Sequence, residues 1–153
     1  MNQVKTDLSK LQTFVKSLDD RHVVKVGIFG AKNSRNGSGK TNADIGAKHE
    51  FGSYSDHIPM RSFLRMPLFA KSENIVKEAS VGSLALLAEG KIVTVLKRLG
   101  IACENAIQEA FGSGGFGSWK PITMFTRSKK HSSQILIDTA QMRRSISSKV
   151  EAV

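Results

Sequence analysis

The segment from Ile45 to Leu68 constrains the fold most, because one helix must end and another must begin within it. An amphipathic run closes at Phe51 and is followed by Gly52, which readily takes the positive φ that ends a helix. Pro59 forces the residue before it into extended geometry. Pro67 stands where the first turn of a helix tolerates proline. The segment therefore predicts a helix, a polar loop and a second helical region.

Two elements are predicted before this segment. From about Gln3 to Leu18, apolar residues recur at steps of three and four, which is typical of an amphipathic helix. The apolar stripe consists of Val4, Leu8, Leu11, Val15 and Leu18. The run from His22 to Phe29 is rich in β-branched residues and predicts a strand. Because alternate strand residues share a face, Val24, Val26 and Ile28 are expected on the same side.

Helical periodicity dominates the chain after Pro67. A break is expected at residues 81–83, and Gly90 is compatible with either a second break or an interior glycine, which costs about 1 kcal/mol relative to alanine. From Lys91 to Ala110 the apolar spacing is most regular and predicts one long helix. Cys103 lies in its apolar stripe, so we interpret it as a small buried hydrophobe. Glu104 belongs to the polar residues expected on the opposite face.

The C-terminal part predicts short elements separated by polar loops. Residues 135–137 are expected to form a short strand, and the basic run 126–133 an exposed loop. Either Asp138 or Thr139 is expected to cap a short helix that ends at Ser145, since both side chains accept hydrogen bonds from free amides.

Polar and apolar residues alternate from Ile146 to Ala152, as in a half-buried strand that would pair with the strand at His22 to Phe29. The predicted fold is therefore α+β: a small, mostly antiparallel sheet packed against a long helix, with an N-terminal amphipathic helix alongside and long flexible loops. At 153 residues, a single domain covering residues 1–153 is expected. The flexible loops are expected at about residues 30–42, 53–59 and 112–134.

Composition narrows the classes of partner. The chain has 23 Lys and Arg against 13 Asp and Glu, a net charge of +10. A single cysteine excludes an internal disulfide and fits a reducing compartment. No run approaches the roughly 20 apolar residues that a membrane helix needs, and no signal-peptide pattern begins the sequence. We therefore expect no membrane partner.

Two short motifs resemble ligand-binding signatures but lack a required residue. The run 39–41 (GKT) follows a strand, as in a P-loop, yet Ser34 stands where that motif requires glycine. His49 and Glu50 resemble the beginning of a zinc-protease helix, yet Ser53 stands where the second histidine is required. No convincing nucleophile–base pair, carboxylate pair or metal cluster accompanies them. We therefore predict a protein that is not an enzyme, without catalytic residues, cofactor or metal.

Two blocks of sequence carry a family resemblance. The first joins residues 49–52 (HEFG) to 58–67 (IPMRSFLRMP), and the second joins 119–121 (WKP) to 136–146 (LIDTAQMRRSI). In this order and spacing they resemble the head-tail joining and tail-completion proteins of long-tailed phages, and the related Mu-type virion morphogenesis proteins. That family commonly reads LIDTGxLRxSI in the second block, so Ala140 and Met142 replace its usual Gly and Leu.

The resemblance implies a structural subunit of the virion neck or tail, made in the host cytoplasm during assembly. It implies a homo-oligomeric ring, often a hexamer, that connects a head-connector or stopper protein to a tail terminator or tail tube protein. Such a ring is also compatible with non-specific contact to DNA in its channel. Arginine and large apolar residues are typical of interfaces. The candidates for subunit contacts are Arg61, Phe63, Arg65, Phe116, Trp119, Arg143 and Arg144. Trp119 is expected to anchor either its own core or an adjacent subunit.

The net charge of +10 leaves a second hypothesis open, a basic nucleic-acid-binding protein that acts on DNA during phage assembly. Such a protein typically gathers its cations on one element with a recognised motif. Here the cations are spread over helices and loops. The sequence therefore favours the structural subunit.

Overall fold

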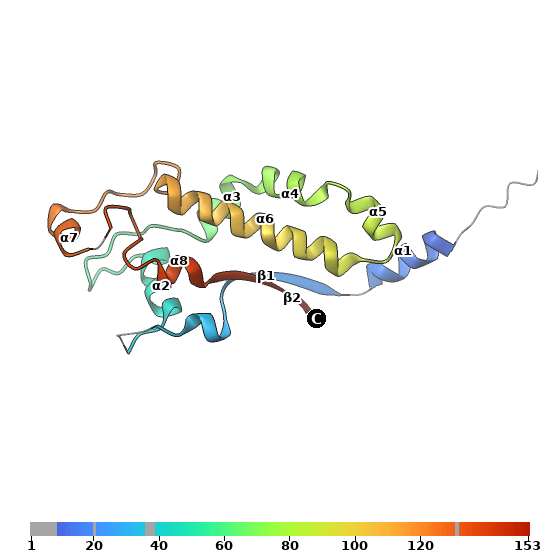
Figure 1. Ribbon diagram of the computed structural model, residues 1–153, viewed down its shortest axis with the longest axis horizontal. Coiled ribbons are helices and arrows are strands. Elements are labelled where there is room, and N and C mark those ends of the chain that lie inside the picture. The colour runs from blue at the N-terminus through green and yellow to red at the C-terminus, as the bar shows by residue number, and fades with distance from the viewer. Residues whose placement is uncertain (1–8, 20, 36–38, 131) are drawn as a thin grey trace, which may run out of the picture.

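The long helix α6 forms the middle of the molecule, with shorter helices on one side and a two-stranded sheet on the other (Figure 1). The computed structural model describes residues 9–19, 21–35, 39–130 and 132–153. Along the chain the elements are α1 (Ser9–Asp19), β1 (His22–Ile28), the 3-10 helix η1 (Gly30–Asn33), α2 (Asn42–Phe51), α3 (Arg65–Ala70), α4 (Ser72–Ser80), α5 (Ser83–Ala88), α6 (Ile92–Ser113), α7 (Met124–Lys129), α8 (Gln141–Ser145) and β2 (Ile146–Ala152).

The predicted pairing of the two strands is confirmed. β1 and β2 are antiparallel, and Val26 lies opposite Ser148 while Ile28 lies opposite Ile146. On the face away from α6, Glu151 forms ion pairs with Lys25 and Lys149. The α+β class and the packing of the sheet on a long helix are therefore as expected.

Helix α6 is buried on two faces, whereas the sequence analysis expected one apolar stripe. The sheet covers one face, and α3, α4 and α5 cover another. Close approach to the sheet requires glycine at position 100, because a Cβ there would lie 2.5 Å from the Oγ of Ser148. Glu104, expected to face solvent, instead accepts hydrogen bonds from the backbone N and the Oγ of Ser148, both at 2.6 Å. Part of the predicted polar face of α6 therefore points toward the sheet instead of toward solvent.

Glycines separate the helices at the expected places. Gly82 has a φ of 68° between α4 and α5, and Gly90 has a φ of 72° between α5 and α6, so the second break is present. Gly52 follows α2 with a φ of 79°, and a Cβ there would lie 3.1 Å from the backbone N of Met60. Both the backbone conformation and the close approach of the next segment favour glycine there.

The N-terminal helix lies elsewhere than expected. Within the described residues it covers Ser9–Asp19, and it packs mainly on α5 at one end of the molecule instead of alongside α6 (Figure 1). The predicted stripe residues Val4 and Leu8 lie outside the described residues. Leu11 and Val15 are 55% and 53% exposed, so the described part of the stripe faces solvent.

Three predictions for the C-terminal part are wrong. The basic run expected to be a loop contributes to α7, whose first turn is capped by Thr123. Residues 135–137 form no strand, because Leu136 has a φ of 60°, which no strand residue adopts. Helix α8 begins after Ala140, with a φ of 59°, and neither Asp138 nor Thr139 caps it. A left-handed residue replaces the predicted side-chain cap.

Candidate functional site

Glu50 joins the end of α2 to the beginning of α3. Its buried carboxylate accepts hydrogen bonds from the backbone N of Phe63 at 2.8 Å, of Leu64 at 2.9 Å and of Arg65 at 3.2 Å. The Oγ of Ser62 and the Nε of Arg65 donate to it as well, at 2.7 and 2.9 Å. We call Glu50 with residues 62–65 the Glu50 hub.

Hydrogen bonding outweighs burial in the Glu50 hub. Burial raises the pKa of Glu50, but the hydrogen bonds from Leu64, Arg65 and Ser62 lower it further than burial raises it, so the net pKa lies below its ordinary value. The carboxylate is therefore ionised at neutral pH. It satisfies amides at the beginning of α3 that have no intrahelical partner. The HEFG motif thus has an architectural role in which glutamate is an anchor.

The two sequence blocks meet beside this hub. Arg61 donates from Nε to the carbonyl oxygen of Lys120 at 2.9 Å and from Nη2 to that of Pro121 at 3.3 Å. In return, the Nε1 of Trp119 donates to the carbonyl oxygen of Ser62 at 3.1 Å. These bonds join segments that are far apart in the sequence.

An aromatic cluster lies beneath this junction. The rings of Phe63 and Phe111 are 5.5 Å apart between centroids, and those of Phe111 and Trp119 are 5.8 Å apart in an edge-on arrangement. Phe63 is fully buried, and Trp119 is 6% exposed. Such pairs stabilise a core by about 0.5–1.5 kcal/mol beyond their burial.

Three of the residues predicted to contact other subunits are therefore interior. Arg61, Phe63 and Trp119 are buried in the core of their own chain, so their side chains do not form its outer surface. The sequence showed an arginine beside apolar residues, but that pattern also fits an arginine that donates to backbone carbonyls. Burial of Trp119 in its own core is one of the two alternatives expected for it.

The other four interface candidates lie at or near the surface. Arg65 is exposed, and its guanidinium lies 4.6 Å from the ring centroid of Phe51. Arg143 is half-buried and donates to Gln108, whereas Arg144 is exposed. Phe116 is half-buried below the ammonium of Lys71. Their contacts with other subunits remain predictions.

A cavity of about 260 Å³ lies where α2, α7, α8 and the segment before α8 come together. We call it the cationic pocket. The residues that line it are Arg35, Ile45, His49, Arg61, Ile122, Thr126, Lys130, Leu136, Asp138, Thr139, Ala140, Gln141 and Met142. The pocket thus draws on both sequence blocks, since Arg61 comes from the first, and Leu136 and residues 138–142 come from the second.

His49 lines this pocket and has an unsatisfied nitrogen. Its Nδ1 is buried and, within the described part of the chain, has no hydrogen-bond partner. Burial, together with the charges of Arg61 and Lys130, lowers the pKa of His49 to about 4. Burial also lowers the pKa of Arg61 and of Lys130, and Asp138 partly opposes this for Lys130. His49 is therefore neutral at pH 7, beside two cations.

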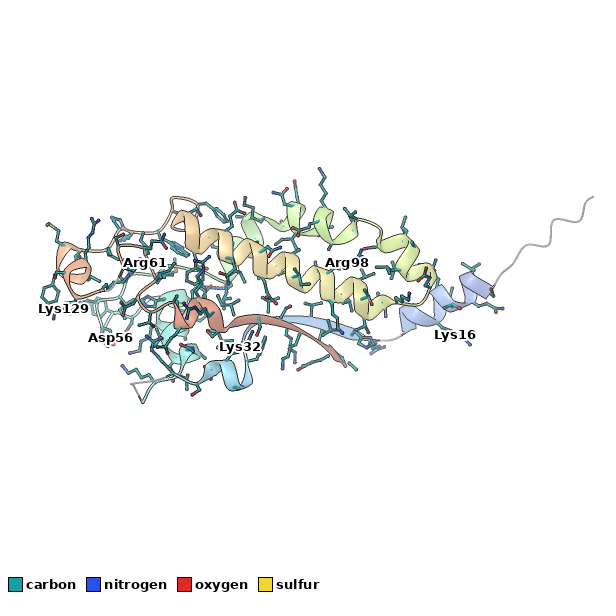
Figure 2. The ribbon with its side chains drawn as sticks, in the orientation of Figure 1. Lys16, Lys32, Asp56, Arg61, Arg98 and Lys129 are labelled. Atoms are coloured by element: carbon teal, nitrogen blue, oxygen red, sulfur yellow. The ribbon has the colours of Figure 1, made fainter. Side chains whose placement is uncertain are left out.

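Large apolar side chains are exposed at both ends of the molecule, and also on the helices between them, such as Phe69 on α3 and Leu84 on α5. At the α1 end these are Leu11 and Val15. At the opposite end Tyr54 is 97% exposed, Met124 89% and Phe125 68%. Figure 2 shows the two ends through its labels, with Lys16 on α1 at one and Asp56 and Lys129 together at the other. We call these surfaces the α1 end and the α7 end.

The incomplete motifs have structural roles where the structure describes them. Thr41, the last residue of the GKT run, caps α2 by accepting from the backbone N of Asp44 at 3.1 Å, and Asp44 accepts in return from the backbone N of Thr41 at 2.9 Å. Burial and the neighbouring Glu104 raise the pKa of the Cys103 thiol, which disfavours the reactive thiolate.

The described residues offer neither a metal site nor a membrane-spanning helix. They contain no cluster of three or more His, Cys, Asp or Glu side chains placed to hold a metal ion. Among the helices described, none combines the length and apolar character needed to cross a membrane. No protein-family model matches the chain, and no curated protein or solved structure is significantly similar to it. Functional inference therefore rests on the residues themselves.

Proposed function

We propose that this protein is a non-enzymatic structural subunit of a phage neck or tail end. In this proposal it forms a homo-oligomeric ring, often of six copies, between a head-connector or stopper protein and a tail terminator or tail tube protein. The resemblance of the two sequence blocks to tail-completion proteins is the starting point. The junction between the blocks supports it, because Arg61 and Trp119 tie them into one buried unit.

The exposed apolar side chains at the α1 end and the α7 end are the main structural support. A ring of identical subunits repeats one heterologous contact, in which one patch meets a different patch on the next copy. An elongated subunit with apolar groups at opposite ends meets that requirement (Figure 2). Their burial between copies would contribute about 25 cal/mol for each Å² of apolar surface removed from water.

The test is the mass of the purified protein by light scattering, at low salt and at about 0.5 M salt, where charges are screened within a few ångströms. We expect a discrete multimer under both conditions. The double variant Leu11→Ser with Val15→Ser should be monomeric, while Gln12→Ser, an exposed change on the same helix, should assemble normally. A wild-type monomer under both conditions would contradict a ring that assembles on its own.

The net charge of +10 supports the second candidate, a basic nucleic-acid-binding protein that acts on DNA during phage assembly. The labelled cations Lys16, Arg98 and Lys129 are spread along the whole molecule (Figure 2). This spread argues against a single basic stripe that binds DNA. Monomeric protein that binds duplex DNA at physiological salt, with an affinity that falls steeply as salt rises, would favour this candidate.

A further inference from the structure

The cationic pocket has an excess of positive charge. Of the described residues that line it, Arg35, Arg61 and Lys130 carry a positive charge and Asp138 a negative one, which gives 3 − 1 = +2. Asp138 is exposed, whereas Arg61 is buried. Buried charges in proteins are normally paired. The interior of the pocket is therefore more positive than its rim.

Neutral groups hold these cations in place. Arg61 and Lys130 each donate to backbone carbonyl oxygens, and Arg35 donates to the amide oxygen of Asn42 at 3.2 Å. Such acceptors fix the orientation of a side chain but leave its formal charge in place. The cations are thus preorganised for a ligand, which lowers the entropy cost of binding one.

His49 lines the same cavity. Its Nδ1 is shielded from solvent and lacks a partner among the described residues. This atom has almost no surface open to the pocket, so an anion there would face the positive charges of Arg61 and Lys130 instead.

The walls and the size restrict the kind of anion. Apolar side chains make up much of the lining, namely Ile45, Ile122, Leu136 and Met142. The cavity of about 260 Å³ is smaller than the roughly 300–1,000 Å³ of pockets that enclose drug-sized ligands. It therefore fits one acidic side chain with an apolar stem better than a nucleotide or a strongly hydrated ion.

We propose that the cationic pocket binds a carboxylate with a short apolar stem, held by the positive charges of Arg61 and Lys130. Arginine matches carboxylate geometry, and its charged hydrogen bonds are stronger than neutral ones. The binding site is a property of the single chain, so it does not depend on the neck assignment.

The test uses butyrate, a carboxylate with a short apolar stem, and follows the side-chain signals of His49 and Arg61 by NMR at pH 7. We expect saturable shifts with a Kd on the order of millimolar, as suits a ligand of few atoms. Bound butyrate should also raise the pKa of His49. Butyramide, the neutral isostere, should bind at least roughly tenfold more weakly, because it cannot form the charge-assisted bonds. Inorganic phosphate should bind more weakly than butyrate.

A matched pair of variants localises the effect. Lys130→Gln should weaken butyrate binding several-fold, whereas Lys129→Gln should leave it unchanged, because Lys129 lies over the Phe125 ring and outside the pocket. Both lysines are near the surface, so both variants should fold. The proposal would be overturned by the absence of a saturable shift, by equal binding of butyramide, by tighter binding of phosphate, or by equal effects of the two variants.

Discussion

Glu50 and His49 are neighbours on α2, yet the structure treats them in opposite ways. The carboxylate of Glu50 accepts five hydrogen bonds. The Nδ1 of His49 is equally hidden from solvent and has no partner in the described residues. The Glu50 hub is therefore complete in a single chain, whereas the cationic pocket is not.

The contrast shows that two neighbouring residues of the HEFG motif have different roles: Glu50 stabilises the fold, and His49 lines the cationic pocket. A saturated buried carboxylate adds rigidity and offers nothing to a partner, because every acceptor position is used. His49 has the opposite properties, because its Nδ1 is unsaturated and lies beside cations that Asp138 only partly compensates. Such a group lowers the stability of the free chain.

The largest expected effect is at the Glu50 hub. Glu50→Gln replaces one carboxylate oxygen with an amide group that faces donors, so we expect a loss of about 3 kcal/mol in the free energy of unfolding. Urea denaturation measures it. Glu109→Gln, which removes only a surface ion pair with Lys71, should cost no more than about 0.5 kcal/mol. Equal losses for the two variants would contradict the hub.

The second-largest expected effect is a loss of stability on acidification, because the fold holds His49 in its neutral form. The pKa of His49 is about 4 in the fold against an ordinary 6.5, so between these values the unfolded chain binds more protons. Stability is fully present above pH 6.5 and falls as the pH drops toward 4. From pH 7 to pH 5 the expected loss is about 2 kcal/mol.

The free energy of unfolding as a function of pH tests this, with His49→Gln as the variant that lacks the titrating group. We expect the slope between pH 7 and pH 5 to become much shallower in the variant. The lowered pKa of Glu50 adds a further loss, but only below the ordinary range of a glutamate. A variant with the wild-type slope would show that another group is responsible.

A smaller effect on stability is expected at Ala140, which lines the cationic pocket. Ala140 has a φ of 59°, a conformation that costs a non-glycine residue roughly 1 kcal/mol or more. Ala140→Gly should therefore stabilise the protein by about 1 kcal/mol, measured as a rise in Tm. Ala85→Gly, on the exposed side of α5, should destabilise it by a similar amount. A fall in Tm for Ala140→Gly would contradict the strain.

The smallest effect is electrostatic and concerns His49 again. Lys130→Gln removes one of the two charges that lower the pKa of His49, so an NMR titration should give a higher pKa than in the wild type. Lys129→Gln, the neighbouring change outside the pocket, should give the wild-type value. An unchanged pKa in Lys130→Gln would place Lys130 too far from His49 to act on it.

Much of the fold was predictable because it depends on local patterns. The strand pairing, the long helix and the breaks at Gly82 and Gly90 follow from alternation, helical spacing and glycine conformations. Positive φ at residues other than glycine has no such signal. The conformations of Leu136 and Ala140 therefore replaced a predicted strand and a predicted cap with turns.

The site was less predictable, because its interactions join distant residues. The motif around Glu50 was visible, but its hydrogen bonds to amides thirteen to fifteen positions further on were not. Likewise, Arg61 finds its acceptors at Lys120 and Pro121, and no spacing rule connects them. The pattern that the second block resembles has glycine at position 140, which suits the positive φ observed there, but the alanine in this chain gives no such signal.

The pairing of β1 with β2 also sets an order of folding. His22 lies opposite Ala152, so the sheet cannot close until β2 has left the ribosome. Helices α3 to α6 pack on one another within residues 65–113 and can form first, while β1 keeps an unpaired edge. Such an edge is prone to pair with the wrong strand. The outward charge of Lys25 on β1 would discourage that error during the wait.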